Sequence, residues 1–259
     1  MRRDAKQEHI RNYYRTLFRA WGPQNWWPAG SRFEVIVGAF LTQNTAWTNV
    51  EKALANLQAA HLLSVSGIRG VPLPQLESLI RPAGYFRQKA KRLKLFVAFL
   101  DQRCGGSLTR LFYRPTAELR KELLTLNGIG PETADSILLY AGNHPVFVVD
   151  AYTRRILDRH EILSAKADYE DVRELFENSL TSLEETAVEL HDDSIPELGD
   201  GLRGAAHKPS AVSTTQRPAL AQIYNEMHGL IVGVGKNHCR KSQAQCDGCP
   251  LQKFLPRLK

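Results

Sequence analysis

Apolar side chains recur at helical spacing along most of the chain. The pattern predicts helices at residues 5–20, 32–43, 47–60, 85–100 and 151–191, and from Ala219 to about Gly233. Residues 32–43 are apolar on nearly all sides, as a helix through the centre of a domain requires. The pattern therefore predicts an all-α protein.

Two short helices joined by a glycine turn are predicted between Thr116 and Gly142. The turn consists of Asn127, Gly128, Ile129 and Gly130. Pro131 suits the first position of the second helix, because its missing N–H costs no hydrogen bond there. Unpaired backbone N–H groups at the start of a helix favour an anion. The turn is therefore either an anion site or a plain helical hairpin within a core.

An apolar run from Val146 to Val149 ends in Asp150. The composition of this run is typical of a buried segment, and the helical sequence AYTRRILDR follows it. Asp150 can therefore cap that helix, act as a carboxylate in a catalytic site, or do both.

The segment LNGIGPETADSILLYAGNHPVFVVDAYTRR resembles the helix-hairpin-helix, Gly/Pro-rich loop and Asp signature of the endonuclease III superfamily of DNA glycosylases. Three other segments agree with it in the expected order: FEVIVGAFLTQNTAWTNVEKAL, RPAGYFRQKAKRL and YNEMHGLIVGVGKNHC. The resemblance covers residues 33–256, apart from a polar insert at residues 192–218. The insert is either an ordered excursion or a mobile loop, and it is expected to be flexible. The resemblance implies a base-excision-repair enzyme that flips out a damaged base and cleaves its N-glycosidic bond.

The resemblance also implies two helical lobes with a DNA-binding cleft between them. Residues 32–150 would form a central lobe that contains the helix-hairpin-helix motif. Residues 1–31 and 151–259 would form the second lobe, with the cysteine cluster at residues 239–249. Asp150 would then lie at the mouth of the cleft.

Two acidic residues carry the implied chemistry. Asp150 would stabilise the positive charge that grows on the sugar and orient or activate water. Family members that also cut the strand use a lysine two residues after the second hairpin glycine, and Glu132 stands there instead. A carboxylate cannot form a Schiff base, so AP lyase activity is expected to be weak or absent. Two alternatives stay open: a glycosylase/AP lyase for oxidised pyrimidines that uses another amine, and a damage-binding protein with little catalysis.

The expected contacts with double-stranded DNA come from two segments. In the family, the residue matching Gln43 begins a loop that fills the gap left by the flipped base; Asn44 follows it. A helix cap and turn would explain the same residues. The hairpin would bind phosphate through its turn and the next helix. The expected DNA-binding set is Gln43, Asn44, Asn127, Gly128, Ile129, Gly130 and Thr133.

Three tryptophans are candidates for a base pocket: Trp26, Trp27 and Trp47. The motifs NWWP, LTQNTAW and RPAGYFRQKAKRL, with a hairpin that lacks lysine, are similar to the 3-methyladenine branch of the superfamily. A cationic alkylated purine is attracted to aromatic faces. The same tryptophans would also serve as ordinary anchors in a core.

Three cysteines near the carboxy end have the spacing C-x6-C-x2-C: Cys239, Cys246 and Cys249. In the family a fourth cysteine follows, and the four hold a [4Fe-4S] cluster in a carboxy-terminal loop. Leu255 occupies that fourth position. A cluster with three Cys ligands and an unidentified fourth ligand is therefore expected. A zinc site that includes His238, or no metal, are the alternatives.

The charge balance of the chain favours a polyanionic partner. The chain of 259 residues has 34 Lys and Arg against 27 Asp and Glu, a net charge of +7, which suits a polyanion. Five cations between Arg87 and Lys94 either bind phosphates or face solvent. No apolar run of membrane-spanning length and no secretion signal is found. The expectation is a cytoplasmic, nucleoid-associated monomer of a bacterium or archaeon.

Overall fold

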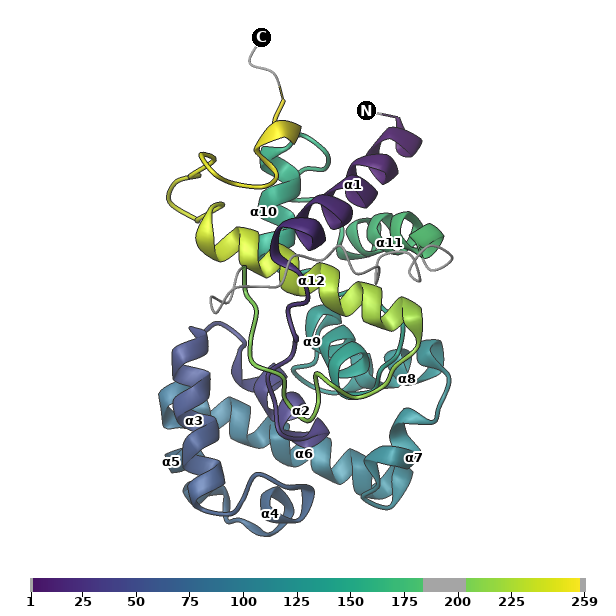
Figure 1. Cartoon of the computed structure of the whole chain (residues 1–259). Helices are drawn as coiled ribbons and strands as arrows, with labels where there is room; N and C mark the ends of the chain where they lie inside the picture. Colours follow the sequence, from purple (N-terminus) through teal and green to yellow (C-terminus); the bar gives the residue numbers. More distant parts are fainter. Residues whose placement is uncertain (1, 184–203, 257–259) are drawn as a thin grey trace. The chain divides into compact units, whose positions relative to one another are not determined.

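The computed structural model describes residues 2–183 and 204–256, and its regular elements are helices (Figure 1), which confirms the predicted all-α fold. None of the described helices has both the length and the hydrophobicity needed to cross a bilayer. The chain divides into two compact units: the described parts of Met1–Pro28 and Pro145–Lys259 form unit 1, and Ala29–His144 forms unit 2. The segment Pro145–Asp150, expected in the central lobe, thus groups with unit 1.

The helices of unit 1 are α1 (Arg3–Trp21), α10 (Ala151–Arg159), α11 (Tyr169–Leu180), η3 (Thr181–Leu183), α12 (Ala219–Asn237) and η5 (Gln252–Phe254). Helix α12 packs against α1, α10 and α11 (Figure 1). It is apolar on most sides, and its helical pattern begins at Ala219 as predicted. This helix therefore forms the centre of unit 1.

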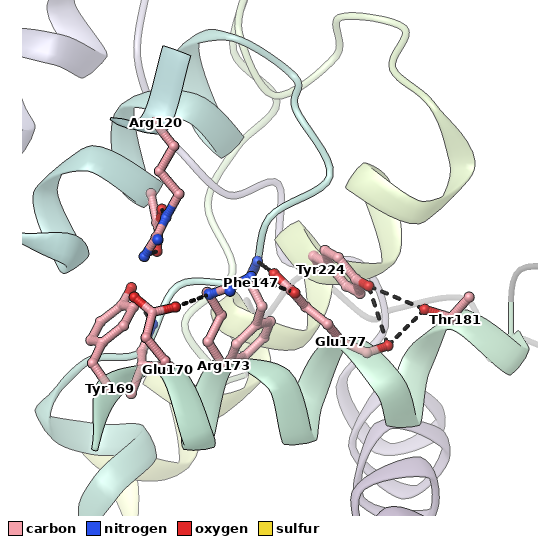
Figure 2. A network of polar contacts seen from close by, with 10 residues as sticks. Arg120, Phe147, Tyr169, Glu170, Arg173, Glu177, Thr181 and Tyr224 are labelled. Atoms are coloured by element: carbon pink, nitrogen blue, oxygen red, sulfur yellow. Dashed lines mark hydrogen bonds and ion pairs between the residues drawn. The ribbon is translucent and has the colours of Figure 1, made fainter. Parts of the chain in front are cut away.

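The segment Val146–Val149 is buried, as its composition predicts, but it is not part of a sheet. Two of its backbone amides donate to side chains of α11, and Figure 2 shows the bond from Phe147 to Glu177. Phe147 N donates to Glu177 Oε1 at 2.9 Å, and Val149 N donates to Tyr169 Oη at 3.2 Å. Because a buried amide without a partner costs free energy, these contacts fix the extended segment that ends at Asp150.

Part of the predicted flexible insert is hydrogen-bonded within unit 1. Residues 192–203 lie outside the described residues, but residues 204–218 are tied to the loop after α1. Ala205 N donates to Gln24 Oε1 at 2.8 Å, and His207 N donates to the Gln24 carbonyl at 3.0 Å. These hydrogen bonds to a buried glutamine are partners that the polar composition of residues 204–218 does not reveal. The flexibility of the insert stays a prediction.

The helices of unit 2 are α2 (Arg32–Leu41), α3 (Trp47–Ala59), α4 (Val65–Gly70), α5 (Leu73–Leu79), η1 (Arg81–Ala83), α6 (Phe86–Cys104), α7 (Leu108–Phe112), α8 (Thr116–Thr125), α9 (Pro131–Ser136) and η2 (Ile137–Ala141), the last a π-helix. Helix α2 begins at the cap Ser31, whose side chain accepts from Glu34 N. It is buried on nearly all sides and packs against α3, α6, α9 and η2. The predicted central helix is thus confirmed.

The basic helix α6 is not a uniform solvated face. Lys89 is 1% exposed, and its Nζ donates to the carbonyls of Leu41 and Ala83, both at 2.8 Å. These carbonyls end α2 and η1, so the ammonium pairs groups that each helix leaves unsatisfied. Burial, with Arg92 nearby, lowers the pKa of Lys89 to about 8. At least this cation of the predicted run is structural.

Candidate functional site

The predicted hairpin is present in unit 2. Helix α8 ends at Thr125, the turn follows, and α9 begins at Pro131 with Gly130 as its N-cap in extended conformation. Within the turn, Ile129 N donates to the Leu126 carbonyl at 3.0 Å. Helix α9 continues directly into the π-helix Ile137–Ala141.

The two hairpin glycines are required for different reasons. Gly128 has φ +84, and a Cβ there would lie 2.0 Å from Arg92 Nε, so both the backbone and its neighbour demand glycine. Gly130 has φ −94, and a Cβ there would meet no atom within 4 Å. The fold therefore explains Gly128 but leaves Gly130 unexplained. Open space beside a helix-starting glycine permits close approach of a ligand to the backbone.

Gln43 connects the loop after α2 to the hairpin. Its Nε2 donates to the Gly128 carbonyl and to Thr133 Oγ1, both at 2.9 Å, and its Oε1 accepts from Arg92 Nη1 at 2.7 Å. Both ends of the amide are thus engaged within unit 2. The predicted DNA-binding residues Gln43, Gly128 and Thr133 are brought together, with Thr133 buried beneath the turn.

The remaining predicted DNA-binding residues differ in exposure. Asn44 is exposed and has φ +54, so it stands at the tip of the loop that Gln43 anchors. Asn127 and Gly130 are exposed, whereas Ile129 is buried. Their contacts with DNA stay predictions.

Asp150 caps α10, as one of the sequence-based interpretations held. Its Oδ1 accepts from Thr153 N at 2.8 Å and from Thr153 Oγ1 at 2.9 Å. The other oxygen, Oδ2, lies 3.7 Å from Nε2 of His228 on α12, and the Asp150 side chain is 14% exposed. Capping therefore occupies one carboxylate oxygen and leaves the other facing an imidazole.

The contact between His228 and Asp150 could not be predicted from the sequence, because nothing in the spacing of the chain joins these two residues. The side chains meet because α10 and α12 pack against each other within unit 1. Burial lowers the pKa of His228, while the charge of Asp150 raises it.

The geometry above agrees with a known family. Residues 37–181, which contain the hairpin and Asp150, match the model of the "HhH-GPD superfamily base excision DNA repair protein". The chain belongs to the HhH-GPD superfamily. The predicted relationship to the endonuclease III superfamily is thereby confirmed.

Three relatives of this HhH-GPD protein refine the comparison. The "Putative DNA repair glycosylase MJ1434" of Methanocaldococcus jannaschii is 40% identical over 97% of this chain and 98% of its own length. Endonuclease III of Thermotoga maritima is 30% identical over 49% of this chain and 55% of its own. The crystal structure of H. pylori 3-methyladenine DNA glycosylase bound to 1,N6-ethenoadenine is similar with a TM-score of 0.68 and 28% identity, covering 89% of this chain and 97% of that one. The likeness to the 3-methyladenine branch is consistent with the prediction.

The HhH-GPD chain carries Glu132 at an exposed position in the first turn of α9. An acidic residue in the first turn of a helix is favourable to the helix dipole. Glu132 therefore stabilises the start of α9, in addition to replacing the lysine that other family members carry at this position.

The tryptophans proposed for the base pocket belong to different units. Trp26 and Trp27 are buried in unit 1, with ring centroids 5.5 Å apart. Trp26 also packs near His228, with centroids 6.0 Å apart, and Lys236 Nζ lies 5.8 Å from a ring centroid of Trp26. Trp47, in unit 2, is half-buried and donates from Nε1 to Glu51 at 2.9 Å. Trp26 and Trp27 pack as anchors of the loop that follows α1. Their contact with a flipped base stays a prediction.

The three predicted metal ligands, Cys239, Cys246 and Cys249, line one pocket of unit 1 together with Leu255, at the position of the family's fourth cysteine. Arg159 Nη1 donates to the sulfur of Cys239 at 3.2 Å. Burial, then the nearby thiols of Cys246 and Cys239, raise the pKa of Cys249.

Within the described ranges, no group of three or more His, Cys, Asp or Glu side chains is arranged to hold one metal ion. A single zinc requires all its ligand atoms within about 2.3 Å of one point, whereas a cluster places each cysteine on a separate iron. The pocket lining contains the three thiols and also His238, the residue considered as a zinc ligand.

Proposed function

We propose that the chain is a DNA glycosylase that hydrolyses the N-glycosidic bond of a damaged base in double-stranded DNA, without cutting the strand. The observation that carries the proposal is the environment of Asp150. Thr153 holds Oδ1, so the carboxylate has a set orientation, while Oδ2 makes no capping bond. Membership of the HhH-GPD superfamily supplies the reaction class.

The proposed chemistry needs a carboxylate and water. As the bond between C1′ and the base breaks, its electron pair leaves with the base, and positive charge grows on the sugar. The Asp150 carboxylate stabilises that charge and accepts a proton from the attacking water, whose oxygen bonds to C1′. The products are the free base and an abasic site.

The hairpin would bind the backbone of the strand. Exposed Gly130, with open space where a side chain would stand, lets a phosphate approach the amides at the start of α9. Contacts of this kind do not read sequence. Affinity should therefore fall with added salt and depend little on the bases that flank the lesion.

The absence of strand cleavage rests on Glu132. An attacking group that forms a Schiff base must be an amine, and the residue at the family's lysine position is acidic. Borohydride reduction during turnover tests this directly. We expect no covalent protein–DNA adduct, and strand breaks only after treatment with alkali. A trapped adduct would favour the glycosylase/AP lyase alternative. Tight binding without either product would favour the damage-binding alternative.

The substrate class that we propose is an alkylated purine. The H. pylori 3-methyladenine enzyme is 28% identical to this chain at a TM-score of 0.68, whereas a trapped endonuclease III–DNA intermediate is 20% identical at a TM-score of 0.67. The higher sequence identity, together with the motifs NWWP, LTQNTAW and RPAGYFRQKAKRL, supports this choice. The test compares base release from duplexes that contain 3-methyladenine, uracil or thymine glycol. Release of 3-methyladenine should be fastest, and preferential release of thymine glycol would contradict this assignment. Asp150→Asn should slow release at least about 100-fold, with DNA still bound.

We further propose that Cys239, Cys246 and Cys249 hold a [4Fe-4S] cluster whose fourth iron has a ligand other than cysteine. Such a cluster would fix the loop that contains it and takes no part in the reaction above. Iron and acid-labile sulfide measured on anaerobically purified protein distinguish a cluster from zinc. A monomeric state and a cytoplasmic, nucleoid-associated location remain predictions, of which sedimentation in solution tests the first.

A further inference from the structure

His228 lies beside the carboxylate at the centre of the proposed chemistry. Its Nε2 is 3.7 Å from Oδ2 of Asp150, and the His228 side chain is 5% exposed. The contact joins α12 to the first turn of α10, and both helices belong to unit 1. The contact between His228 and Asp150 therefore lies in the interior of unit 1, where the packing of α10 against α12 places the two side chains.

The two oxygens of Asp150 have different surroundings. Oδ1 is held by two hydrogen bonds from Thr153. Oδ2 faces His228 at 3.7 Å, which is longer than a formed hydrogen bond. Thr153 thus fixes Oδ1 at the start of α10, and His228 is the polar neighbour of Oδ2.

Aromatic rings hold the imidazole in place. The ring centroid of His228 lies 6.0 Å from that of Trp26 and 6.4 Å from that of Phe147. Burial lowers the pKa of His228, and the nearby Asp150 raises it. A neutral imidazole donates one hydrogen bond and carries no net charge. It can steady a carboxylate without neutralising it.

We propose that His228 is a positioning residue for Asp150, and that its Nε2–H directs Oδ2 toward the sugar of the flipped nucleotide. The inference rests on the proposed function, because it assigns a catalytic task to Oδ2 of Asp150, the oxygen that does not cap α10. His228 does not itself contact substrate in this proposal. It acts by presenting its Nε2–H to Oδ2, the oxygen that the bonds from Thr153 do not hold.

A histidine in this position would also fill space between two aromatic rings. Substitutions can separate the two roles. Phe keeps an aromatic ring between Trp26 and Phe147 but has no donor. Gln carries an amide nitrogen at about the reach of Nε2, whereas the nitrogen of Asn corresponds to Nδ1. A positioning role therefore predicts that Gln rescues activity and Phe does not; a packing role predicts the reverse.

The experiment measures single-turnover base release from a duplex with one 3-methyladenine, with uracil and thymine glycol duplexes run in parallel. DNA affinity is measured with a duplex that contains a tetrahydrofuran abasic analogue. We expect His228→Phe and His228→Asn to slow base release roughly 10- to 100-fold, as misplacement of a reacting group does, with affinity unchanged. His228→Gln should recover most of the rate. A His228→Phe variant as fast as wild type, or a loss that follows affinity, overturns the proposal.

Asp150→Asn separates failure of this inference from failure of the proposed function. If Asp150→Asn releases base at the wild-type rate, the proposed function is wrong. If Asp150→Asn is inactive and His228→Phe is fully active, only the role of His228 is wrong.

A second measurement, by NMR, tests the role of His228 without substituting it, so it does not depend on whether the His228 variants fold. The imidazole nitrogen resonances of His228 should show a neutral Nε2–H form in the wild-type chain and shift in Asp150→Asn. Unchanged resonances overturn the inference.

Discussion

Gln43 donates from Nε2 to the backbone carbonyl of Gly128 at 2.9 Å, so the loop after α2 and the turn of the hairpin are directly bonded. The other end of the same amide accepts from Arg92. One side chain thereby joins the two segments expected to contact DNA. The loop tip at Asn44 and the hairpin turn are held as one surface of unit 2.

This bond predicts a different effect for two neighbouring substitutions. Gln43→Leu removes both the donor and the acceptor and leaves part-buried partners unsatisfied, which should lower the free energy of unfolding by about 1–3 kcal/mol. It should also weaken binding to undamaged DNA. Asn44→Ala serves as the control, since Asn44 is exposed and should alter stability little. Denaturant unfolding and binding to an unmodified duplex measure both effects. Equal loss of stability in the two variants would contradict the prediction.

The hairpin glycines provide a matched pair. Gly128→Ala should destabilise the protein by about 1–3 kcal/mol, because φ is +84 and the new Cβ meets Arg92. Gly130→Ala should fold with nearly wild-type stability, because φ is −94 and the site is open. We expect Gly130→Ala instead to weaken DNA binding. Thermal unfolding and titration with a duplex at low salt measure the two outcomes. Unchanged affinity in Gly130→Ala would argue against phosphate contact at this turn.

Glu177 is predicted to stabilise the segment that carries Asp150. Its carboxylate accepts from Phe147 N and from Arg173, as Figure 2 shows. Glu177→Ala leaves a buried amide without its partner and should cost about 1–3 kcal/mol of unfolding free energy. Glu174→Ala on the exposed side of α11 should change it by less than about 0.5 kcal/mol. Urea unfolding compares the variants. A Glu177→Ala variant as stable as Glu174→Ala would show that this amide finds another partner.

Glu226 predicts a pH dependence of stability. It is buried, and its Oε2 accepts from Gln24 N at 2.7 Å. Burial raises its pKa from 4.5 to about 7, against the lowering effect of that hydrogen bond. The unfolded chain ionises this group at a lower pH than the folded chain does. Its contribution to stability is therefore complete below pH 4.5 and is lost as the pH rises through about 7.

The loss should amount to roughly 3 kcal/mol across that window. Glu226→Gln keeps the shape and an acceptor for Gln24 but does not titrate. Unfolding between pH 5 and pH 8, expressed as the difference between wild type and variant, isolates the effect. We expect wild type to lose stability relative to Glu226→Gln as pH rises. Parallel curves would contradict the prediction.

Sequence determined the longer helices and several local signals at their ends, but not the short helices α4, α5 and α7. The start of α9 at Pro131 and the cap of α10 at Asp150 follow from neighbouring residues and from the apolar period, so they could be predicted without tertiary information. The buried run from Val146 to Val149 was equally evident, because its hydrophobicity is a property of the segment itself.

Tertiary packing alone decided which side chains meet. Three contacts join residues that are distant in sequence. They are the approach of His228 to Asp150, the hydrogen bond from Gln43 to Gly128 and the hydrogen bond from Lys89 to Leu41. The hydrogen bond from Ala205 N to buried Gln24 is likewise not evident from the polar composition of residues 204–218. Hydrophobic periodicity reports which face of one element is buried. It carries no information about the polar partner that a neighbouring element brings to that face, because that depends on how the helices pack.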